Sequence, residues 1–350
     1  TATGQHAEAL HVSEQALGMW RALAAEQPSL ATDAEYGRTL HNHANRLYTL
    51  GHWAQAAEAA TEAVAFYRAM PGENRLDRLA KLALALDNCA TFLSRVRRHD
   101  ESLAAAEEAV TISRTLVAAQ PGHRARLAST LRTYAARLAT LDQSDAALEV
   151  LAEALAIYRE LAAEERSAHL SRLAETISDL AALSDTGDAL TLAQEAVQLR
   201  RELVPDNRAV QLPGLALSLC NLARKQADAG QLDAALETGD ESVRLIREAA
   251  QNNRLGVLPR YAFLVREQAD RLDRAGRAAD ALELGEEAVK IAREALGTHR
   301  AAGLGGLADA LLAHAQRLAT GPGQNKRTRR QARELTRQAD RLLAEQDTPD

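Results

Sequence analysis

Seven arginines recur at one position of a repeated sequence block, and guanidinium groups of this kind bind carboxylates well. Six of them follow a glutamate by six residues. Six residues correspond to about 600° of helical rotation, so each arginine needs a partner on a neighbouring helix or on a ligand. We expect a structural role in repeat stacking, and the alternative is a stripe that binds an acidic partner. These ladder arginines are Arg21, Arg68, Arg114, Arg159, Arg201, Arg247 and Arg293.

Motifs for catalysis or metal binding do not occur in the sequence. It lacks the phosphate loop G-x-x-x-x-G-K-[ST], the nucleophile motif G-x-S-x-G, and the zinc motifs H-E-x-x-H and C-x-x-C. His41 and His43 are two residues apart on a predicted helix and therefore point in different directions. Cys89 and Cys220 are about three repeats apart, too far for a disulfide, and we expect both to be reduced. We expect no enzyme, no metal and no cofactor.

The arginine block defines a long internal repeat. Its clearest copies are Gly230–Arg247 and Gly276–Arg293, and five others drift from them. The apolar residue four before each arginine recurs at steps of 47, 46, 45, 42, 46 and 46 residues. A nearly fixed period of this length indicates a solenoid of stacked supersecondary units.

Each repeat is predicted to contain two antiparallel helices. Helix B is the arginine block, with small residues seven apart, such as Ala235 and Ser242, on one face. Helix A lies between the blocks. Because alanine and leucine supply the core and both favour helix, we predict an all-α chain, an α-solenoid of antiparallel helix pairs. Each helix A carries one small residue at a fixed place: Ala44, Ala90, Ala135, Ala181, Ala223, Ala269 and Ala315.

Glycine and proline mark the ends of the predicted helices. Gly51, Gly230 and Gly276 are expected at the tight turn from helix A to helix B. Pro213 and Pro259 hold one repeat position, which we place in the first turn of helix A, where proline is tolerated.

Two parts of the chain follow from this pattern. Residues 1–320 are predicted to form the solenoid of about seven repeats. Residues 321–350 are predicted to form a C-terminal capping helix, or half of a decayed repeat, with a frayed tail at Asp347–Asp350.

The repeat resembles a known family. A small alanine on helix A, glycine at the turn and two small residues on helix B resemble the tetratricopeptide repeat, over almost the whole chain. The copies are longer than the family's usual form, and resemble the repeats of kinesin light chain and of bacterial regulators that place such arrays behind a nucleotide-switching or protease-like domain. Gly239 and Gly285, in the middle of helix B, stand where the family often has an aromatic residue, which implies tighter helix packing.

The resemblance implies a right-handed superhelix whose concave face, lined by helix A, binds an extended peptide or a helix of another protein. In the long-repeat relatives an asparagine just before the helix-A alanine bonds the peptide backbone, and an amide offers both donor and acceptor. The alternative is a hydrogen bond within the helix pair. The candidate ligand-binding residues are Asn42, Asn88, Asp179 and Asn221, with His41, Asn45 and Tyr48 beside them.

Charge and hydropathy exclude some partners. The formal net charge is −6, which argues against a nucleic-acid binder. No apolar run reaches 18 residues, so we expect no membrane span. The two cysteines, expected to be reduced, fit a cytoplasmic location. The basic segment from Lys326 to Arg341 is expected to be a solvated cap, and the alternative is contact with nucleic acid or an acidic protein.

We therefore predict a protein- or peptide-binding scaffold. The chain starts at Thr1 without an initiator methionine, so we expect it to be fused to another domain, as the sensor or interaction arm of a larger bacterial signalling or defence protein. The ligand's identity does not follow from the sequence. The alternatives are a helical-repeat nucleic-acid binder and a purely structural spacer or dimerisation rod.

Overall fold

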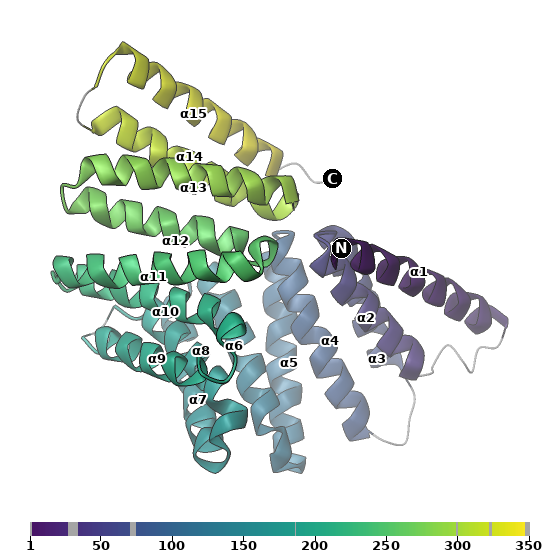
Figure 1. The fold of residues 1–350 in the computed structure, drawn as a ribbon. Helices are drawn as coiled ribbons and strands as arrows, with labels where there is room; N and C mark the ends of the chain where they lie inside the picture. The colour runs from purple at the N-terminus through teal and green to yellow at the C-terminus, as the bar shows by residue number, and fades with distance from the viewer. Residues whose placement is uncertain are drawn as a thin grey trace. The chain divides into compact units, whose positions relative to one another are not determined.

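The computed structural model describes residues 2–26, 34–70, 75–185, 187–298, 300–321 and 324–346. Within these ranges the chain is all-α, with fifteen α-helices, one short 3-10 helix and no strand. The chain divides into two compact units, Thr1–His169 and Leu170–Asp350. In each unit, consecutive helices pack side by side as antiparallel pairs (Figure 1). The all-α solenoid predicted from the repeat is confirmed.

The helices alternate between the two predicted kinds. The first unit contains α1 (Ala2–Glu26), α2 (Ala34–Thr49), α3 (Trp53–Ala69), α4 (Arg75–Arg95), α5 (His99–Ala119), η2 (Pro121–His123), α6 (Arg124–Thr140) and α7 (Ser144–Glu164). The second contains most of α8 (Arg166–Leu183), then α9 (Ala189–Leu203), α10 (Arg208–Asp228), α11 (Leu232–Asn252), α12 (Arg254–Arg274), α13 (Ala278–Thr298), α14 (Arg300–Thr320) and α15 (Lys326–Gln346). Even-numbered helices up to α14 are helices A, and odd-numbered helices up to α13 are helices B.

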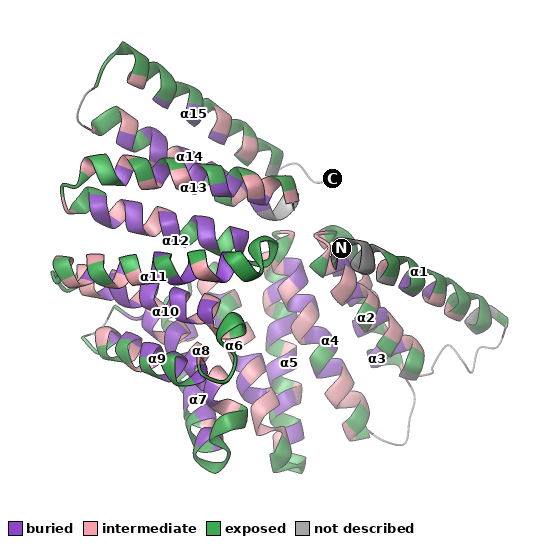
Figure 2. Cartoon of the chain, in the orientation of Figure 1, coloured by how far each residue is buried: buried purple, intermediate pink, exposed green. Residues whose placement is uncertain are grey.

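Small residues mark the faces where helices meet. All seven helix-A alanines, from Ala44 to Ala315, are buried. On the helices B, Ala235 and Ser242 are also buried, and the Ser242 hydroxyl donates to the carbonyl oxygen of Ala216 at 2.7 Å. Figure 2 shows the buried residues as stripes along the helices rather than as one central ball. Because each stripe is closed by a neighbouring helix, the core extends along each unit.

The turn from helix A to helix B needs a left-handed backbone conformation. Gly51, Gly230 and Gly276 have φ of 83°, 77° and 74°, as the sequence predicts. Arg97 and Asp142 hold the same turn in other repeats with φ of 60° and 57°. Because side chains with a Cβ are disfavoured in this region, glycine is the residue best suited to it.

Pro213 and Pro259 lie deeper in their helices than predicted. Helices α10 and α12 begin at Arg208 and Arg254, so each proline falls in the second turn and the first-turn prediction is wrong. The preceding asparagines start the helices early. The Asn207 side chain accepts from the amide of Val210, and that of Asn253 accepts from the amide of Gly256.

The glycines in the middle of helix B make room for polar side chains. A Cβ on Gly239 would lie 1.8 Å from Oε1 of Gln268, on the paired helix A. A Cβ on Gly285 would lie 2.9 Å from both Nδ1 of His314 and Nη1 of Arg317. The absent aromatic residue is therefore replaced by buried polar side chains from helix A, and not only by closer packing.

Helix α15 packs on α14 much as the earlier helices B pack on their partners. Its buried Ala332 and Ala339 are seven residues apart, like the small residues of a helix B. Arg293, the last ladder arginine, donates to Oε1 of Gln338 at 3.4 Å. The basic side chains of α15 point mostly to solvent, and the tail Asp347–Asp350 lies outside the described residues.

Candidate functional site

The ladder arginines pair with glutamates of the next helix B. Arg21 contacts Glu62 at 2.8 Å, and the same arrangement recurs along both units. Each acceptor is the glutamate six residues before the next arginine, so the repeat pairs with itself one step on. The other pairs are Arg68–Glu108, Arg114–Glu153 at 2.7 Å, Arg201–Glu241 at 2.9 Å and Arg247–Glu287 at 2.6 Å. Arg159 holds the same register on α7 and is exposed.

Two ladder glutamates also bond a tyrosine of helix A. The hydroxyls of Tyr36 and Tyr261 donate to Glu62 and Glu287 at 3.0 and 2.9 Å. The hydrogen bond that Arg247 itself donates to Glu287 is the largest cause that raises the pKa of Arg247. The pairs remain well exposed, and exposed ion pairs contribute only about 0–1 kcal/mol each. Each pair of the ladder therefore adds little to stability.

Helices α2 and α4 bring four of the predicted ligand-binding residues together. The Asn88 amide donates to Oδ1 of Asn45 at 3.1 Å and lies 3.3 Å from Nε2 of His41. The Tyr48 hydroxyl accepts from Nε of Arg95 at 3.1 Å. Burial lowers the pKa of His41, which favours its neutral form as a hydrogen-bond acceptor.

This network determines which polar group of the Asn88 side chain remains available to a ligand. An amide nitrogen carries two N–H groups, and His41 and Asn45 together can accept both. The Asn88 carbonyl oxygen then remains as its available group. Both donors are directed to α2, the helix A of the preceding repeat, and not to the paired helix B that the sequence alternative named.

The other predicted ligand-binding residues are more scattered. Asn42 is exposed on α2, and no hydrogen bond of its side chain occurs among the described residues. Asp179 and Asn221 are partly exposed on α8 and α10, in the second unit. Asp179 has polar contacts of its own. The structure therefore gathers the candidates of the first unit into a cluster, apart from Asn42.

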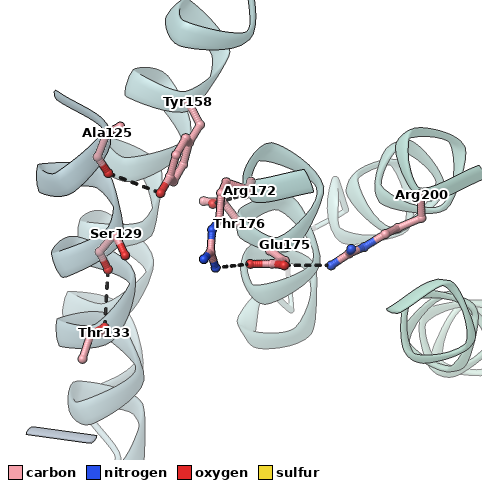
Figure 3. A network of polar contacts seen from close by, with 8 residues as sticks. All are labelled: Ala125, Ser129, Thr133, Tyr158, Arg172, Glu175, Thr176 and Arg200. Carbon is pink, nitrogen blue, oxygen red and sulfur yellow. Dashed lines mark hydrogen bonds and ion pairs between the residues drawn. The ribbon is translucent and has the colours of Figure 1, made fainter. Parts of the chain in front are cut away.

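One charged cluster in the second unit was not predicted. Glu175 on α8 accepts from Nη1 of Arg172 at 2.9 Å and lies 3.4 Å from Nη2 of Arg200 on α9 (Figure 3). Arg172 and Arg260 both stand nine residues before a helix-A alanine, and Lys81 and Arg126 hold that place in the first unit. This recurrence is a sequence signal that could have identified the cluster.

A small apolar pocket opens between α12, α13 and α14. Its lining includes Phe263, Leu307 and Ala292, with Arg266 and Asp309 at the polar side. The Arg266 guanidinium lies 5.4 Å from the centre of the Phe263 ring, in a cation–π arrangement. Phe263 is 40% exposed, so an apolar side chain of a ligand could contact it directly.

In the described part of the chain, no group of three or more histidine, cysteine or acidic residues is arranged to hold a metal ion. None of the described helices is long and apolar enough to cross a membrane. Both cysteines are buried and free.

Comparison with known proteins identifies the repeat. Residues 269–301, which include the end of α12 and all of α13, match the family model of the tetratricopeptide repeat. No curated protein sequence matches the chain.

Solved structures with the same fold are numerous. BtubC from P. vanneervenii has a TM-score of 0.54 at 19% identity, covering 71% of this chain and 92% of that one. Aspartyl phosphate phosphatase F from Bacillus subtilis has a TM-score of 0.60 at 13% identity, covering 92% and 73%. A signal transduction ATPase with a tetratricopeptide repeat sensor, from Pyrococcus horikoshii, has a TM-score of 0.51 at 12% identity, covering 91% and 48%. At these identities the likeness shows the fold alone.

Proposed function

Because this chain is built of tetratricopeptide repeats, we propose that it is a protein- or peptide-binding scaffold that uses the face formed by its helices A. The observation that carries the proposal is the polar cluster of His41, Asn45 and Asn88 on α2 and α4. It joins two consecutive helices A at the surface where the family binds extended peptides. A ligand there meets positioned polar groups rather than mobile side chains, which reduces the entropy lost on binding.

Individual roles follow from the remaining hydrogen-bonding capacity. The Asn88 carbonyl oxygen accepts a backbone N–H of the ligand, while His41 and Asn45 hold the Asn88 amide in place. Asn42 is exposed and offers both a donor and an acceptor. Tyr48 stacks on Phe92 with ring centres 4.5 Å apart and presents an apolar edge to the ligand. Asp179 and Asn221 hold the same repeat position, two residues before the small alanine, on helices A of the second unit.

The ladder on the helices B takes no part in ligand binding in this proposal. Each paired arginine already donates to a glutamate of the next helix B, as in the pair between Arg247 and Glu287. The array spans residues 1–320, with 321–350 as its cap. It is non-catalytic and cytoplasmic, and it serves as the sensor or interaction arm of a larger bacterial signalling or defence protein. One structurally similar protein is a signal transduction ATPase with a sensor of these repeats, which supports that setting.

A capture experiment tests the proposal. The wild-type chain and a variant with Asn42, Asn88 and Asn221 all changed to alanine are immobilised, and proteins captured from source-cell lysate are identified by mass spectrometry. Circular dichroism must show equal helicity in both. A partner retained by wild type and lost by the variant supports the helix-A face. Equal capture by both moves the binding site elsewhere, and no partner on either favours a structural spacer.

The control is Arg201→Gln, which removes an exposed ladder arginine on α9. It changes the charge without touching the helix-A face, so we expect it to capture the same partner as wild type. Loss of the partner in this control would contradict the separation of the two faces.

A further inference from the structure

The unpredicted cluster in the second unit brings several arginine side chains close to one carboxylate. Arg172 and Arg200 contact Glu175 from different helices, as Figure 3 shows. Desolvation is the largest cause that lowers the pKa of Arg260 on α12. The nearby charge of Arg200 lowers this pKa further, and the charge of Glu175 raises it. Arg172 and Arg200 both pair with Glu175, and Arg260 lies within electrostatic range of it. We call Arg172, Arg200 and Arg260 the arginine cluster.

Arg200 is a buried member of this cluster. The residue is 8% exposed, although it lies on a helix B, and its Nε is buried without a hydrogen-bond partner. Gly214 on α10 leaves the space that it fills, because a Cβ there would lie 3.0 Å from Cζ and Nη1 of Arg200. A buried guanidinium with an unused donor and a shared counter-ion is stabilised by an additional anion.

The register explains why Arg200 takes this path. Arg172, Gly214 and Arg260 each stand nine residues before the small alanine of their helix A. Gly214 interrupts the basic position on α10, and the guanidinium of Arg200 reaches the same place from α9. The helices α8, α10 and α12 thus each have a guanidinium group at this position of the helix-A face.

Other acidic residues follow the cluster arginines along α8 and α12 and could balance their charge. Asp179 lies one turn after Glu175 on α8 and has polar contacts of its own. Glu267 on α12 is 3.0 Å from Arg266, which is a separate pair. Asp270 pairs with Arg317 and also lies 3.6 Å from Arg266. The ion pairs of Glu267 and Asp270 involve arginines outside the cluster.

We propose that the arginine cluster binds an anionic side chain of the peptide ligand, either a carboxylate or a phosphate. The proposal rests on the proposed function and names the chemistry of its ligand. Guanidinium groups bind both anions through paired, charge-assisted hydrogen bonds, which suits either source. A nucleic acid is the less favoured ligand, because the chain carries a net charge of −6.

Fluorescence anisotropy with the full chain tests the proposal. The probes are three fluorescein-labelled nine-residue peptides in which glycine alternates with glutamate, phosphoserine or glutamine. We expect the glutamate or phosphoserine peptide to bind and the glutamine peptide not to bind. Tighter binding of phosphoserine identifies phosphate as the preferred anion, and tighter binding of glutamate identifies carboxylate. Absence of binding by both anionic peptides would overturn the proposal.

Matched variants locate the binding. Arg172→Gln and Arg260→Gln remove exposed members of the cluster and keep the buried Arg200. Each should weaken the anionic peptide about tenfold, which corresponds to about 1.4 kcal/mol. Arg201→Gln removes the same charge from the adjacent residue on α9, in the exposed ladder, and should change affinity less than about twofold. Equal losses in all three would show only long-range charge attraction and would overturn the site.

Two further results separate this proposal from others. Gly214→Ala places a methyl group against the Arg200 guanidinium and should weaken the anionic peptide without removing any charge. A single-stranded RNA that binds more tightly than the peptides, with the same dependence on Arg172, would overturn the peptide assignment. If neither anionic peptide binds but the lysate partner is still captured through Asn42, Asn88 and Asn221, the scaffold function stands and the anion site falls.

Discussion

Two rows of cations run along the repeats, and they differ in almost every physical respect. The row on the helices B is the exposed ladder, in which an arginine forms an ion pair with a glutamate of the next helix B, as in Arg21–Glu62 and Arg247–Glu287. The row on the helices A lies two residues after five of the seven small alanines, and it is buried in Lys225, Arg271 and Arg317. Its partners change from repeat to repeat.

The buried row shows this variety clearly. Arg271 donates to the Cys220 carbonyl oxygen at 3.0 Å and to Oε1 of Gln268 at 2.9 Å. Arg317 instead pairs with the carboxylate of Asp270. Lys225 donates to the carbonyl oxygen of Ser184. The regular row therefore repeats one contact between successive helices B, whereas the irregular row gives each helix A its own polar environment.

The largest predicted effect concerns the buried row. Asp270→Ala leaves Arg317, whose side chain is 3% exposed, without its carboxylate. Breaking a buried pair in this way costs about 3 kcal/mol, near the lower end because Asp270 is partly exposed. Urea unfolding of the variant measures the loss. Asp280→Ala, which removes an exposed acid paired with Arg277, is the control and should cost less than about 1 kcal/mol.

The next effect tests the faces on which the rows are built. Ala235→Leu introduces a large side chain at a fully buried position of α11 and should cost about 1–3 kcal/mol through overpacking. Thermal unfolding measures it, with Ala279→Leu at an exposed position of α13 as the control. An unchanged melting temperature for Ala235→Leu would mean that the helix faces are assigned wrongly.

A smaller effect should appear on acidification. Burial lowers the pKa of His41, His43 and His314 below the ordinary 6.5. The unfolded chain therefore binds protons first as the pH falls below 6.5, so the free energy of unfolding decreases from about pH 7 to pH 5.

Unfolding in urea across this pH range should show the decrease, and His314→Gln should make it shallower. Arg317 also lowers the pKa of His314, and Glu286 raises it, but burial is the largest cause. An identical pH dependence in the variant would show that His314 does not contribute.

The smallest effect belongs to the exposed ladder. Glu287→Gln removes the charge that pairs with Arg247 and keeps an oxygen for the Tyr261 hydroxyl. We expect a loss below about 1 kcal/mol that fades in about 1 M salt. A double-mutant cycle with Arg247→Gln isolates the pair. A coupling as large as the loss in Asp270→Ala would erase the difference between the rows.

Much of the fold could be predicted because it is local and repeated. The small residues on the helix faces follow the helical period, and the glycines at the A-to-B turn follow from backbone sterics. The start of helix A was missed because Asn207 and Asn253 cap it earlier than the prolines suggest. Local capping competes with the proline signal, and sequence alone does not decide between them.

The candidate site was predictable only in part. The sequence placed His41, Asn45, Tyr48 and Asn88 on the helices A, and their meeting depends on how α2 packs against α4. The ladder's glutamates were visible, but their pairing one repeat onward depends on the stacking geometry. The role of Arg200 could not be predicted, because its side chain extends from a helix B to Gly214 on the neighbouring helix A. The repeat pattern of the sequence does not indicate this path.

The most direct measurement is a charge swap in the ladder. Arg247→Glu combined with Glu287→Arg keeps an ion pair while it reverses both charges. If the ladder only sets the repeat spacing, the double variant unfolds close to wild type and captures the same lysate partner. A double variant that folds normally but loses the partner would show that the ladder binds the ligand, and would contradict the separation of the two rows.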